Sequence, residues 1–304
     1  MSVDLIIICG ATGSGKSNLA IELAKKLDTE IISADSLAIY KQLNIGTAKP
    51  TEIELNTVKH HLIDVVSPTE TFSVHDYEKL ALPIVDNLIK QGKIPIICGG
   101  TGFYVNSILY KMGYGGTSEN VEVREKFKQL ATTLGNNYVY NELIKVDPET
   151  AEKLHPNDLT RVIRALEIYY ATGKKKSQQQ DKAVARYNYK AYCISHQRSV
   201  LYDRINKRVD IMLENGLVNE VKSLINMGIT KENQCMQGIG YKEVYDAIIS
   251  NDFSGLSELL KLNSRHYAKR QITFFKRLEG LQEVSSNINE AINYILNDID
   301  ELSN

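Results

Sequence analysis

Residues 10–17 of this chain read GATGSGKS, and this short loop constrains the fold more than any other feature of the sequence. The apolar run LIIIC precedes it, and a helical pattern, NLAIELAKKLD, follows it. A glycine-rich loop between a strand and a helix lets backbone N–H groups converge on phosphate oxygens, and the helix start adds partial positive charge. The flanking pattern disfavours a glycine turn without function. We therefore predict a P-loop that binds a polyphosphate.

The loop indicates the ligand but leaves the reaction open. Lys16 would neutralise the anion, and the hydroxyl of Ser17 is an oxygen ligand suited to Mg²⁺. Transfer of a phosphoryl group and departure of a whole diphosphate need the same anion clamp. Residues outside the loop must therefore decide the chemistry.

Short apolar runs alternate with helical patterns over the first third of the chain. The runs at 5–9, 30–33 and 94–98 end near Gly, Asp or Ser, as strands buried on both faces of a parallel sheet do. The fold class that we predict is therefore α/β, a P-loop-type parallel sheet flanked by helices. Ligands of such sheets bind beyond the carboxyl ends of the strands.

Helical patterns dominate from about residue 118, and a strand-like run returns at 189–195. This change predicts a mainly helical domain inserted into the α/β core. The expected organisation is a first part of the core at 1–117, a helical insertion at 118–199, and a second part of the core with a basic segment and a final helix at 200–304.

The composition is that of an ordinary globular protein. Of the 304 residues 43% are hydrophobic and 24% charged, and the net charge of −1 gives no global basic excess. The four cysteines lie singly, without the close spacing of a zinc site, and we expect buried thiols. The amino-terminal apolar run is too short for a signal peptide or an anchor, so we expect a cytoplasmic protein without membrane attachment.

Two polar residues follow predicted strands at the edge where the loop lies. Asp35 comes after the second strand, where its carboxylate could act as a base or cap a short helix over 36–42. Thr101 follows the third strand within GGTGFY, where its hydroxyl could face a ligand or cap the next helix. The residues alone leave both alternatives open.

A basic segment lies at 263–278, NSRHYAKRQITFFKRL. It has five Lys or Arg residues, no acidic residue, and three aromatic residues, Tyr267, Phe274 and Phe275. Interleaved cations and aromatic rings suit a groove for unpaired RNA bases. The alternative is an amphipathic helix that buries its rings and exposes its cations to solvent.

An ordered set of motifs over nearly the whole chain resembles the tRNA dimethylallyltransferases, also called tRNA isopentenyltransferases. The motifs are GATGSGKS, DSLAIYKQLNIGTAKP, HHLID, GGTGFY, HPNDLTRVIRALEIYYATGK, LYDRINKRVDIMLENGLVNEV, QGIGYKE and YAKRQITFFKR. The resemblance implies transfer of a dimethylallyl group from dimethylallyl diphosphate to N6 of adenosine 37, next to the anticodon of tRNA, with release of pyrophosphate. Many relatives carry Gln at the place of Ala38 and Trp at the place of Phe274, so local base contacts differ here.

The resemblance also assigns roles to residues of the donor site. Asp35 matches the general base, and Thr101 matches the hydroxyl that helps to hold the reacting amine. Mg²⁺ would bind beside Ser17, whereas His60 and His61 are structural. Arg204 and Arg208 serve either the same anion or a solvated face. The residues matched to the diphosphate are Gly10, Ala11, Thr12, Gly13, Ser14, Gly15, Lys16, Ser17 and Arg124.

For the RNA, the resemblance implies a larger set of contacts. The partners are the anticodon stem-loop of tRNA and dimethylallyl diphosphate, and we expect a monomer. The helical insertion would close over the anticodon stem. The residues matched to tRNA contacts are Asp35, Ser36, Leu37, Ala38, Thr101, Arg124, Thr160, Arg161, Arg164, Gln237, Gly238, Gly240, Tyr241, Lys242, Lys269, Arg270, Lys276 and Arg277.

Three other functions stay open. The main alternative is a nucleotide or small-molecule kinase with Mg-ATP on the loop and Asp35 as the base for a hydroxyl. Transfer of the prenyl group to free AMP or ATP would leave the basic segment unexplained. A nucleotide-gated RNA-binding switch would use the loop and the basic segment without needing Asp35.

Overall fold

The chain forms two compact units in the computed structural model, which describes residues 3–111, 113, 120–178 and 184–300. Unit 1 combines residues 1–109 with 185–304, and unit 2 comprises 110–184. The expected insertion, 118–199, is therefore shifted relative to unit 2. The reason is that the strand at its carboxyl side pairs with the central strand of the core and belongs to unit 1.

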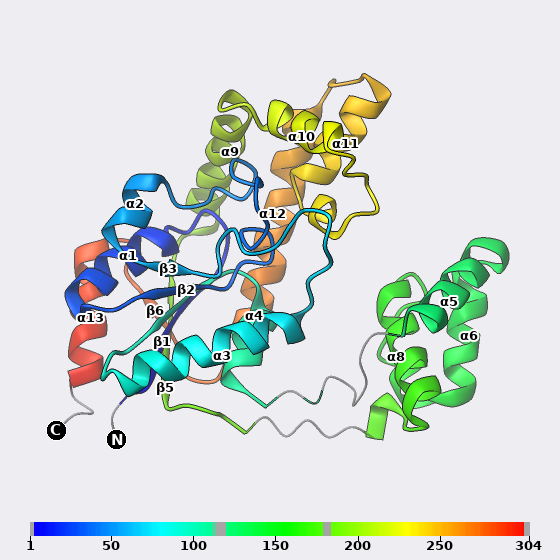
Figure 1. Cartoon of the computed structure of the whole chain (residues 1–304), viewed down its shortest axis with the longest axis horizontal. Helices are drawn as coiled ribbons and strands as arrows, with labels where there is room; N and C mark the ends of the chain where they lie inside the picture. Colours follow the sequence, from blue (N-terminus) through cyan, green and yellow to red (C-terminus); the bar gives the residue numbers. More distant parts are fainter. Residues whose placement is uncertain (1–2, 112, 114–119, 179–183, 301–304) are drawn as a thin grey trace. The chain divides into compact units, whose positions relative to one another are not determined.

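Unit 1 is built on a six-stranded sheet of order β3-β2-β4-β1-β5-β6, in which every neighbouring pair is parallel (Figure 1). The α/β fold class is confirmed. Two strands at the sheet edges, β3 and β6, were not predicted, because they are short and incompletely buried. The strands are β1 (Leu5–Cys9), β2 (Ile31–Ser33), β3 (His60–His61), β4 (Ile96–Gly99), β5 (Tyr189–Ile194) and β6 (Leu281–Val284).

Helices cover both faces of this sheet, because its central strands are apolar on both sides. On one face α1 (Lys16–Leu27) and α13 (Ile288–Asp300) bury their apolar stripes against β1, β4 and β5. On the other face α3 (Val74–Lys90) packs with α4 (Gly102–Leu109) (Figure 1). A capping box formed by Ser73 and Asp76 begins α3, and Pro83 lies within it, as expected.

Helices also fill the second part of unit 1. The apolar pattern at 201–225 divides into α9 (Arg198–Glu214) and α10 (Leu217–Asn226), because Gly216 adopts a left-handed conformation between them. A long helix, α12 (Leu256–Phe275), packs against α9. The remaining elements of unit 1 are α2 (Glu52–Thr57), η3 (Gln234–Gln237) and α11 (Tyr241–Ser250).

Unit 2 is a small helical bundle with its own apolar core. Its longer helices are amphipathic and bury Phe127, Val139, Leu143 and Leu166 together. Asp147 caps the short third helix through the amide of Thr150. The elements are α5 (Val121–Leu134), α6 (Asn136–Val146), α7 (Pro148–Ala151), α8 (Leu159–Thr172) and η2 (Lys176–Gln178).

Membrane-spanning helices and disulfides are both absent from the residues that the structure describes. None of the helices among them combines the length and the apolar character needed to cross a bilayer. The four cysteines form no disulfide, and Cys9, Cys98 and Cys235 are buried while Cys193 is half-buried.

Candidate active site

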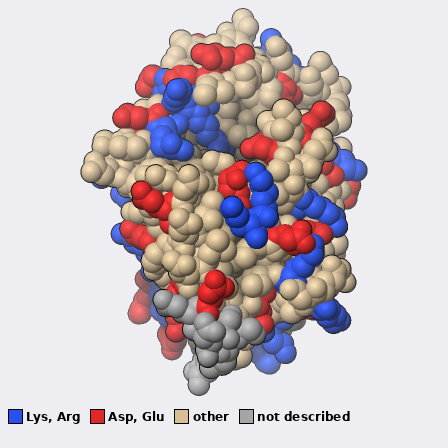
Figure 2. Space-filling view, turned by 90° about the vertical axis from the view of Figure 1, so that its left-hand side faces the viewer, with Lys and Arg blue, Asp and Glu red and all other residues tan. Residues whose placement is uncertain are grey.

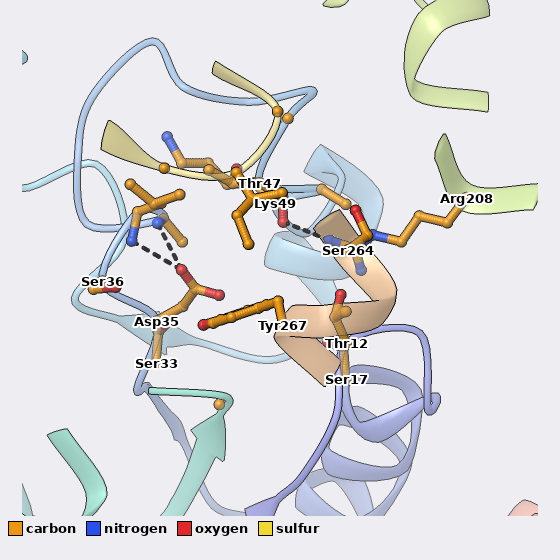
Figure 3. Close-up of a pocket in the computed structure, with 18 of the residues that line it drawn as sticks. Thr12, Ser17, Ser33, Asp35, Ser36, Thr47, Lys49, Arg208, Ser264 and Tyr267 are labelled. Carbon is orange, nitrogen blue, oxygen red and sulfur yellow. Dashed lines mark hydrogen bonds between the residues drawn. The ribbon is translucent and has the colours of Figure 1, made fainter. Parts of the chain in front are cut away.

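A cavity of about 430 Å³ opens in unit 1 at the carboxyl ends of the strands (Figure 3). Its wall combines the P-loop, the segment after β2, the loop over 46–50, helix α9, the turn at 237–240, and helix α12. These segments come from distant parts of the chain and meet because parallel strands end at one edge of the sheet. The cavity is therefore where the sequence predicted ligand binding.

The P-loop lines this cavity through Thr12, Lys16 and Ser17, and its backbone leaves amides without a cap at the start of α1. Gly13 and Gly15 adopt φ angles of 76° and 96°, which side chains other than glycine rarely tolerate. Helix α1 begins directly after Gly15 without a side-chain cap. Within the described part of the chain, the amides of Gly13 and Gly15 donate no hydrogen bond. A helix start with orphan donors is an anion site.

Side chains from distant elements hold the loop in this conformation. The guanidinium of Arg204 donates through Nε to the carbonyl oxygen of Gly13 (2.7 Å), and the ring of His196 contacts the carbonyl oxygen of Ser14 (2.8 Å). The carbonyl groups thus point away from the ligand side. Arg204, one of the two uncertain arginines, has a structural contact here.

Two half-buried cations line the cavity close to each other. Lys16 and Arg208 both line it, and burial lowers the pKa of each. Arg208 also lowers the pKa of Lys16 by charge repulsion, so the two groups are close enough to interact. Arg208 donates through Nη2 to the carbonyl oxygen of Thr47 (3.1 Å) (Figure 3). Desolvated like charges of this kind are stabilised by a bound anion.

Asp35 combines the two roles that the sequence left open. Its Oδ1 accepts the backbone N–H groups of Leu37 (2.9 Å) and Ala38 (3.1 Å), so one oxygen caps the following segment. That segment is a series of turns rather than the short helix considered over 36–42. Figure 3 shows the second oxygen turned toward the cavity, which Asp35 lines.

Thr101 joins the end of β4 to the Asp35 segment. Its hydroxyl accepts the backbone N–H of Ser36 (3.0 Å) and donates to the hydroxyl of Ser36 (3.2 Å), instead of capping α4. The close approach depends on Gly99, where an added Cβ would lie 2.1 Å from the carbonyl oxygen of Ala34. Thr101 does not line the cavity itself but contacts Ser36, which does.

Lys49 stabilises the segment after Asp35, a function that sequence reasoning missed. The ammonium donates to the carbonyl oxygen of Tyr40 (2.5 Å), Oδ1 of Asn44 (3.1 Å) and Oδ1 of Asp64 (2.6 Å). Four residues of this segment other than glycine adopt left-handed φ angles of 47–68°, a strained conformation that such contacts help to hold. These residues are Gln42, Ala48, Leu62 and Asp64.

The loop over 44–47 rests on Glu220 of α10. The Glu220 carboxylate accepts the backbone N–H groups of Asn44 (2.8 Å), Ile45 (2.8 Å) and Gly46 (3.1 Å) and the hydroxyl of Tyr241 (2.6 Å). Tyr241 is completely buried. Its match to a tRNA contact is therefore wrong for this conformation, because the ring lies beneath Gly46 and supports the loop.

One helix face connects the P-loop with the loop after β4. Gln271 of α12 accepts the backbone N–H of Thr12 (2.8 Å) through Oε1 and donates through Nε2 to the carbonyl oxygen of Gly100 (3.0 Å). The amide of Thr12 is thus engaged within the protein and is not available to a phosphate. The sequence offered no signal for this contact, since 259 residues separate its partners.

The structure divides the predicted site residues of unit 1 into two groups. One group comprises Gly10, Ala11, Gly13, Ser14 and Gly15 of the P-loop, together with Thr101, the buried Tyr241, and the exposed residues Lys242, Lys269, Lys276 and Arg277. None of these lines the cavity. The predicted residues that do line it are Thr12, Lys16, Ser17, Asp35, Ser36, Leu37, Ala38, Gln237, Gly238, Gly240 and Arg270.

The basic segment at 263–278 shows features of both alternatives, the RNA groove and the amphipathic helix. Phe275 is buried in the core, and Phe274 packs edge-on against Phe103 at a centroid distance of 5.5 Å. The cations of the segment are largely exposed, and Arg270 also reaches the cavity. On the face drawn in Figure 2, Lys and Arg side chains alternate with Asp and Glu, as the net charge suggests.

The predicted residues of unit 2 lie around a fully buried carboxylate. Glu167 accepts contacts from Arg124 (3.1 Å) and Arg164 (2.6 Å), and Arg161 forms an ion pair with Asp158. Arg124 therefore forms an ion pair with a buried glutamate. The assignments of Arg124, Arg161, Arg164 and Thr160 to ligands stay predictions. His60 and His61 form β3, where His61 contacts Glu30 (2.6 Å).

A family profile described as IPP transferase matches residues 38–278. The chain belongs to the IPP transferase family. The tRNA dimethylallyltransferase of Acetivibrio thermocellus is 47% identical over 282 residues, which cover 91% of this chain and 90% of that protein. The tRNA dimethylallyltransferase of Caldanaerobacter subterraneus is 45% identical over 294 residues, which cover 93% and 91%. The resemblance noted in the sequence is thereby confirmed.

Solved structures of IPP transferases have the same fold. The full-length tRNA isopentenylpyrophosphate transferase from Bacillus halodurans is similar with a TM-score of 0.73 and 38% identity, over 98% of this chain and 97% of that chain. A eukaryotic dimethylallyltransferase acting on tRNA is similar with a TM-score of 0.83 and 30% identity, over 98% and 79%. The family profile begins after the P-loop and Asp35, and the fold brings both to the matched region.

Proposed function

We propose that this IPP transferase transfers a dimethylallyl group from dimethylallyl diphosphate to N6 of adenosine 37 in tRNA. One observation carries the proposal: a cationic phosphate site and an acidic side chain, Asp35, face a single cavity. The kinase alternative shares the phosphate site but has no support from the relatives, which are prenyltransferases by name. The reaction forms one C–N bond and breaks one C–O bond.

The leaving group is a diphosphate, and its departure requires positive charge that is fixed in place. As the allylic C–O bond breaks, the bonding electrons move to the diphosphate oxygen and negative charge grows there. The uncapped amides of α1, Lys16 and Arg208 would stabilise that charge. Their desolvation strengthens the interaction, because no water competes for the anion.

The nucleophile is an aromatic amine whose lone pair is delocalised into adenine. The amine attacks as the C–O bond breaks, and a carboxylate that accepts its proton makes the attack feasible. Asp35 suits this role because Oδ1 is held by two backbone N–H groups while the other oxygen faces the cavity. Thr101, which was matched to the hydroxyl that holds the amine, would act indirectly here by holding Ser36 and the segment after Asp35 in place.

A divalent cation would fit beside Ser17. The hydroxyl of Ser17 lines the cavity and makes no hydrogen bond within the described residues. Mg²⁺ prefers a few oxygen ligands and retains waters, so one hydroxyl and the diphosphate oxygens form an adequate ligand set. Such an ion would add positive charge beside the leaving group.

The RNA substrate must present an unstacked adenine to this cavity. Adenosine 37 lies in a loop, where removing a base from its stack costs less than in a duplex. We assign the exposed cations of the basic segment, Lys269, Arg270, Lys276 and Arg277, to the RNA backbone. One chain supplies the whole cavity wall, so we propose a monomer that acts in the cytoplasm, where tRNA is found.

The test combines product analysis with an isosteric variant. Wild-type protein, dimethylallyl diphosphate and tRNA should yield the prenylated nucleoside and pyrophosphate. Phosphoryl transfer from ATP without prenylation would refute the proposal. The variant Asp35→Asn preserves an oxygen for the amides of Leu37 and Ala38 but cannot accept a proton, so turnover should fall roughly 100-fold or more while tRNA still binds.

Two further variants separate the base from the cap. Asp35→Ala removes both roles and should lower stability as well as turnover. Asp28→Asn changes an exposed aspartate at the end of α1 and should leave both unchanged. Full turnover in Asp35→Asn would leave Asp35 with the capping role alone.

A further inference from the structure

Tyr267 of α12 lies at the centre of the cavity rather than on its rim. Figure 3 shows its ring edge-on between Asp35 on one side and Thr12 and Ser17 of the P-loop on the other. All four residues line the cavity. The ring therefore lines the cavity that a group would cross between the P-loop and Asp35.

Contacts on both sides fix the position of the ring. The hydroxyl of Tyr267 interacts with the side chains of Thr101 and Gln271. Gln271 holds the amide of Thr12, and Thr101 holds the amide of Ser36. The hydroxyl of Tyr267 thus lies near two side chains that hold the phosphate loop and the segment after Asp35.

The charge distribution of the cavity leaves one problem for prenyl transfer. The cations that stabilise the departing diphosphate, Lys16 and Arg208, repel the positive charge that spreads over the allyl group as the C–O bond weakens. An aromatic face attracts a cation through its quadrupole without adding a charge that would compete for the diphosphate. Among the described residues that line the cavity, Tyr267 has the one phenyl-type ring. That ring already accommodates a cation, because the guanidinium of Arg270 lies over it at 5.7 Å from its centroid.

We propose that the ring of Tyr267 faces the allyl group during transfer and stabilises its developing positive charge. This inference rests on the proposed prenyl transfer and names a catalytic residue for it. The C–O electrons leave with the diphosphate, the amine supplies the electrons of the new C–N bond, and its proton goes to Asp35. The ring itself forms no bond.

The hydroxyl of Tyr267 takes no part in proton transfer. Burial and the nearby carboxylate of Asp35 raise the pKa of Tyr267 to about 12, so the phenol is neutral at physiological pH. A neutral ring keeps its quadrupole, and its hydroxyl serves to anchor it. Removing the hydroxyl and weakening the quadrupole should therefore have separable effects.

The experiment replaces Tyr267 by phenylalanine and then by phenylalanines that carry one, two or three fluorines on the ring. Fluorine withdraws electron density from the face with little change in shape. Single-turnover prenylation of tRNA at saturating substrates should fall progressively with fluorine number, by about 10- to 30-fold over the series, the range expected for a desolvated cation–π contact. The affinities for tRNA and for dimethylallyl diphosphate should change less than 3-fold.

Two results would overturn the inference. A rate that is independent of fluorine number shows that the quadrupole is not used. A loss confined to tRNA affinity shows that the ring stacks on adenine instead. Fluorotyrosines at position 267 retain the hydroxyl anchor and should reproduce the slope, which covers the case of a phenylalanine series that folds poorly. The same phenylalanine substitution at Tyr294, on α13, is the control.

The wild-type reaction separates the two hypotheses. If the wild-type protein forms no prenylated nucleoside, the proposed function fails and the inference fails with it. If the wild type prenylates tRNA and the fluorinated series is flat, the proposed function stands and only the assignment of Tyr267 is lost.

Discussion

Glu220 offers the sharpest test of how the cavity wall is held. Its two carboxylate oxygens each accept two donors: Oε2 accepts the amides of Asn44 and Ile45, and Oε1 accepts the amide of Gly46 and the hydroxyl of Tyr241. The variant Glu220→Gln has nearly the same shape but offers one acceptor oxygen. Two of the four donors would then face an NH₂ group.

The magnitude follows from the hydrogen bonds that the glutamine side chain cannot accept. A hydrogen bond to a charged group contributes about 1.5–3 kcal/mol when buried, and less where solvent reaches the donor, as it does at Asn44. We expect Glu220→Gln to lower the free energy of unfolding by about 2–3 kcal/mol. The loop carries Thr47, whose carbonyl oxygen anchors Arg208, so kcat/KM for the allylic diphosphate should fall as well.

Urea denaturation and steady-state prenylation measure the two effects. Glu214→Gln, at the exposed end of the preceding helix, is the matched control and should behave as wild type. Tyr241→Phe removes one donor and should lower stability by about 1 kcal/mol. If Glu220→Gln matches its control in both assays, the carboxylate does not hold the loop and the reasoning fails.

Three further predictions test other contacts. The pKa of Lys16 is lowered from its ordinary value of 10.5, so the ammonium loses its proton below that pH. As the pH rises in this range, pyrophosphate affinity should fall and the stability of the ligand-free protein should rise. Titration calorimetry should show a smaller pH dependence of pyrophosphate affinity in Lys16→Met than in the wild type. Gln271→Leu leaves the amide of Thr12 unpaired and should lower stability by roughly 2–4 kcal/mol in urea, with weaker pyrophosphate binding. Gly102→Ala places a Cβ 2.1 Å from the ring of Phe274, so thermal unfolding should show destabilisation that Phe274→Leu relieves; equal effects in both backgrounds would contradict this.

Features set by local sequence were predictable. The P-loop and the buried strands each depend on a few neighbouring residues, and the structure has them where expected. Asp35 was identified as an acidic residue at the strand edge, but its two roles could not be separated. A carboxylate has two oxygens, and only the fold shows that one caps while the other faces the cavity.

Features that depend on long-range contacts were not predictable. β3 and β6 are too short to show a hydrophobic period, and they are strands because a neighbouring strand supplies their hydrogen bonds. Tyr241 was misassigned for a related reason. A tyrosine beside two glycines is typical of a binding turn, and its complete burial depends on a loop almost 200 residues earlier in the chain.

Different faces of α12 have different surroundings. This explains why the segment at 263–278 has features both of an RNA-binding segment and of an amphipathic helix. Ser264, Tyr267 and Gln271 recur at spacings of three and four residues, which places them on one face of the helix, and all three line the cavity. Lys269 and Lys276 lie on other faces and are exposed. The helix therefore carries cavity-lining residues on its inner face and, on its outer surface, the cations that we propose for RNA. Because both sets of residues belong to one helix, RNA bound by these cations would be held at a fixed position relative to the Tyr267 ring.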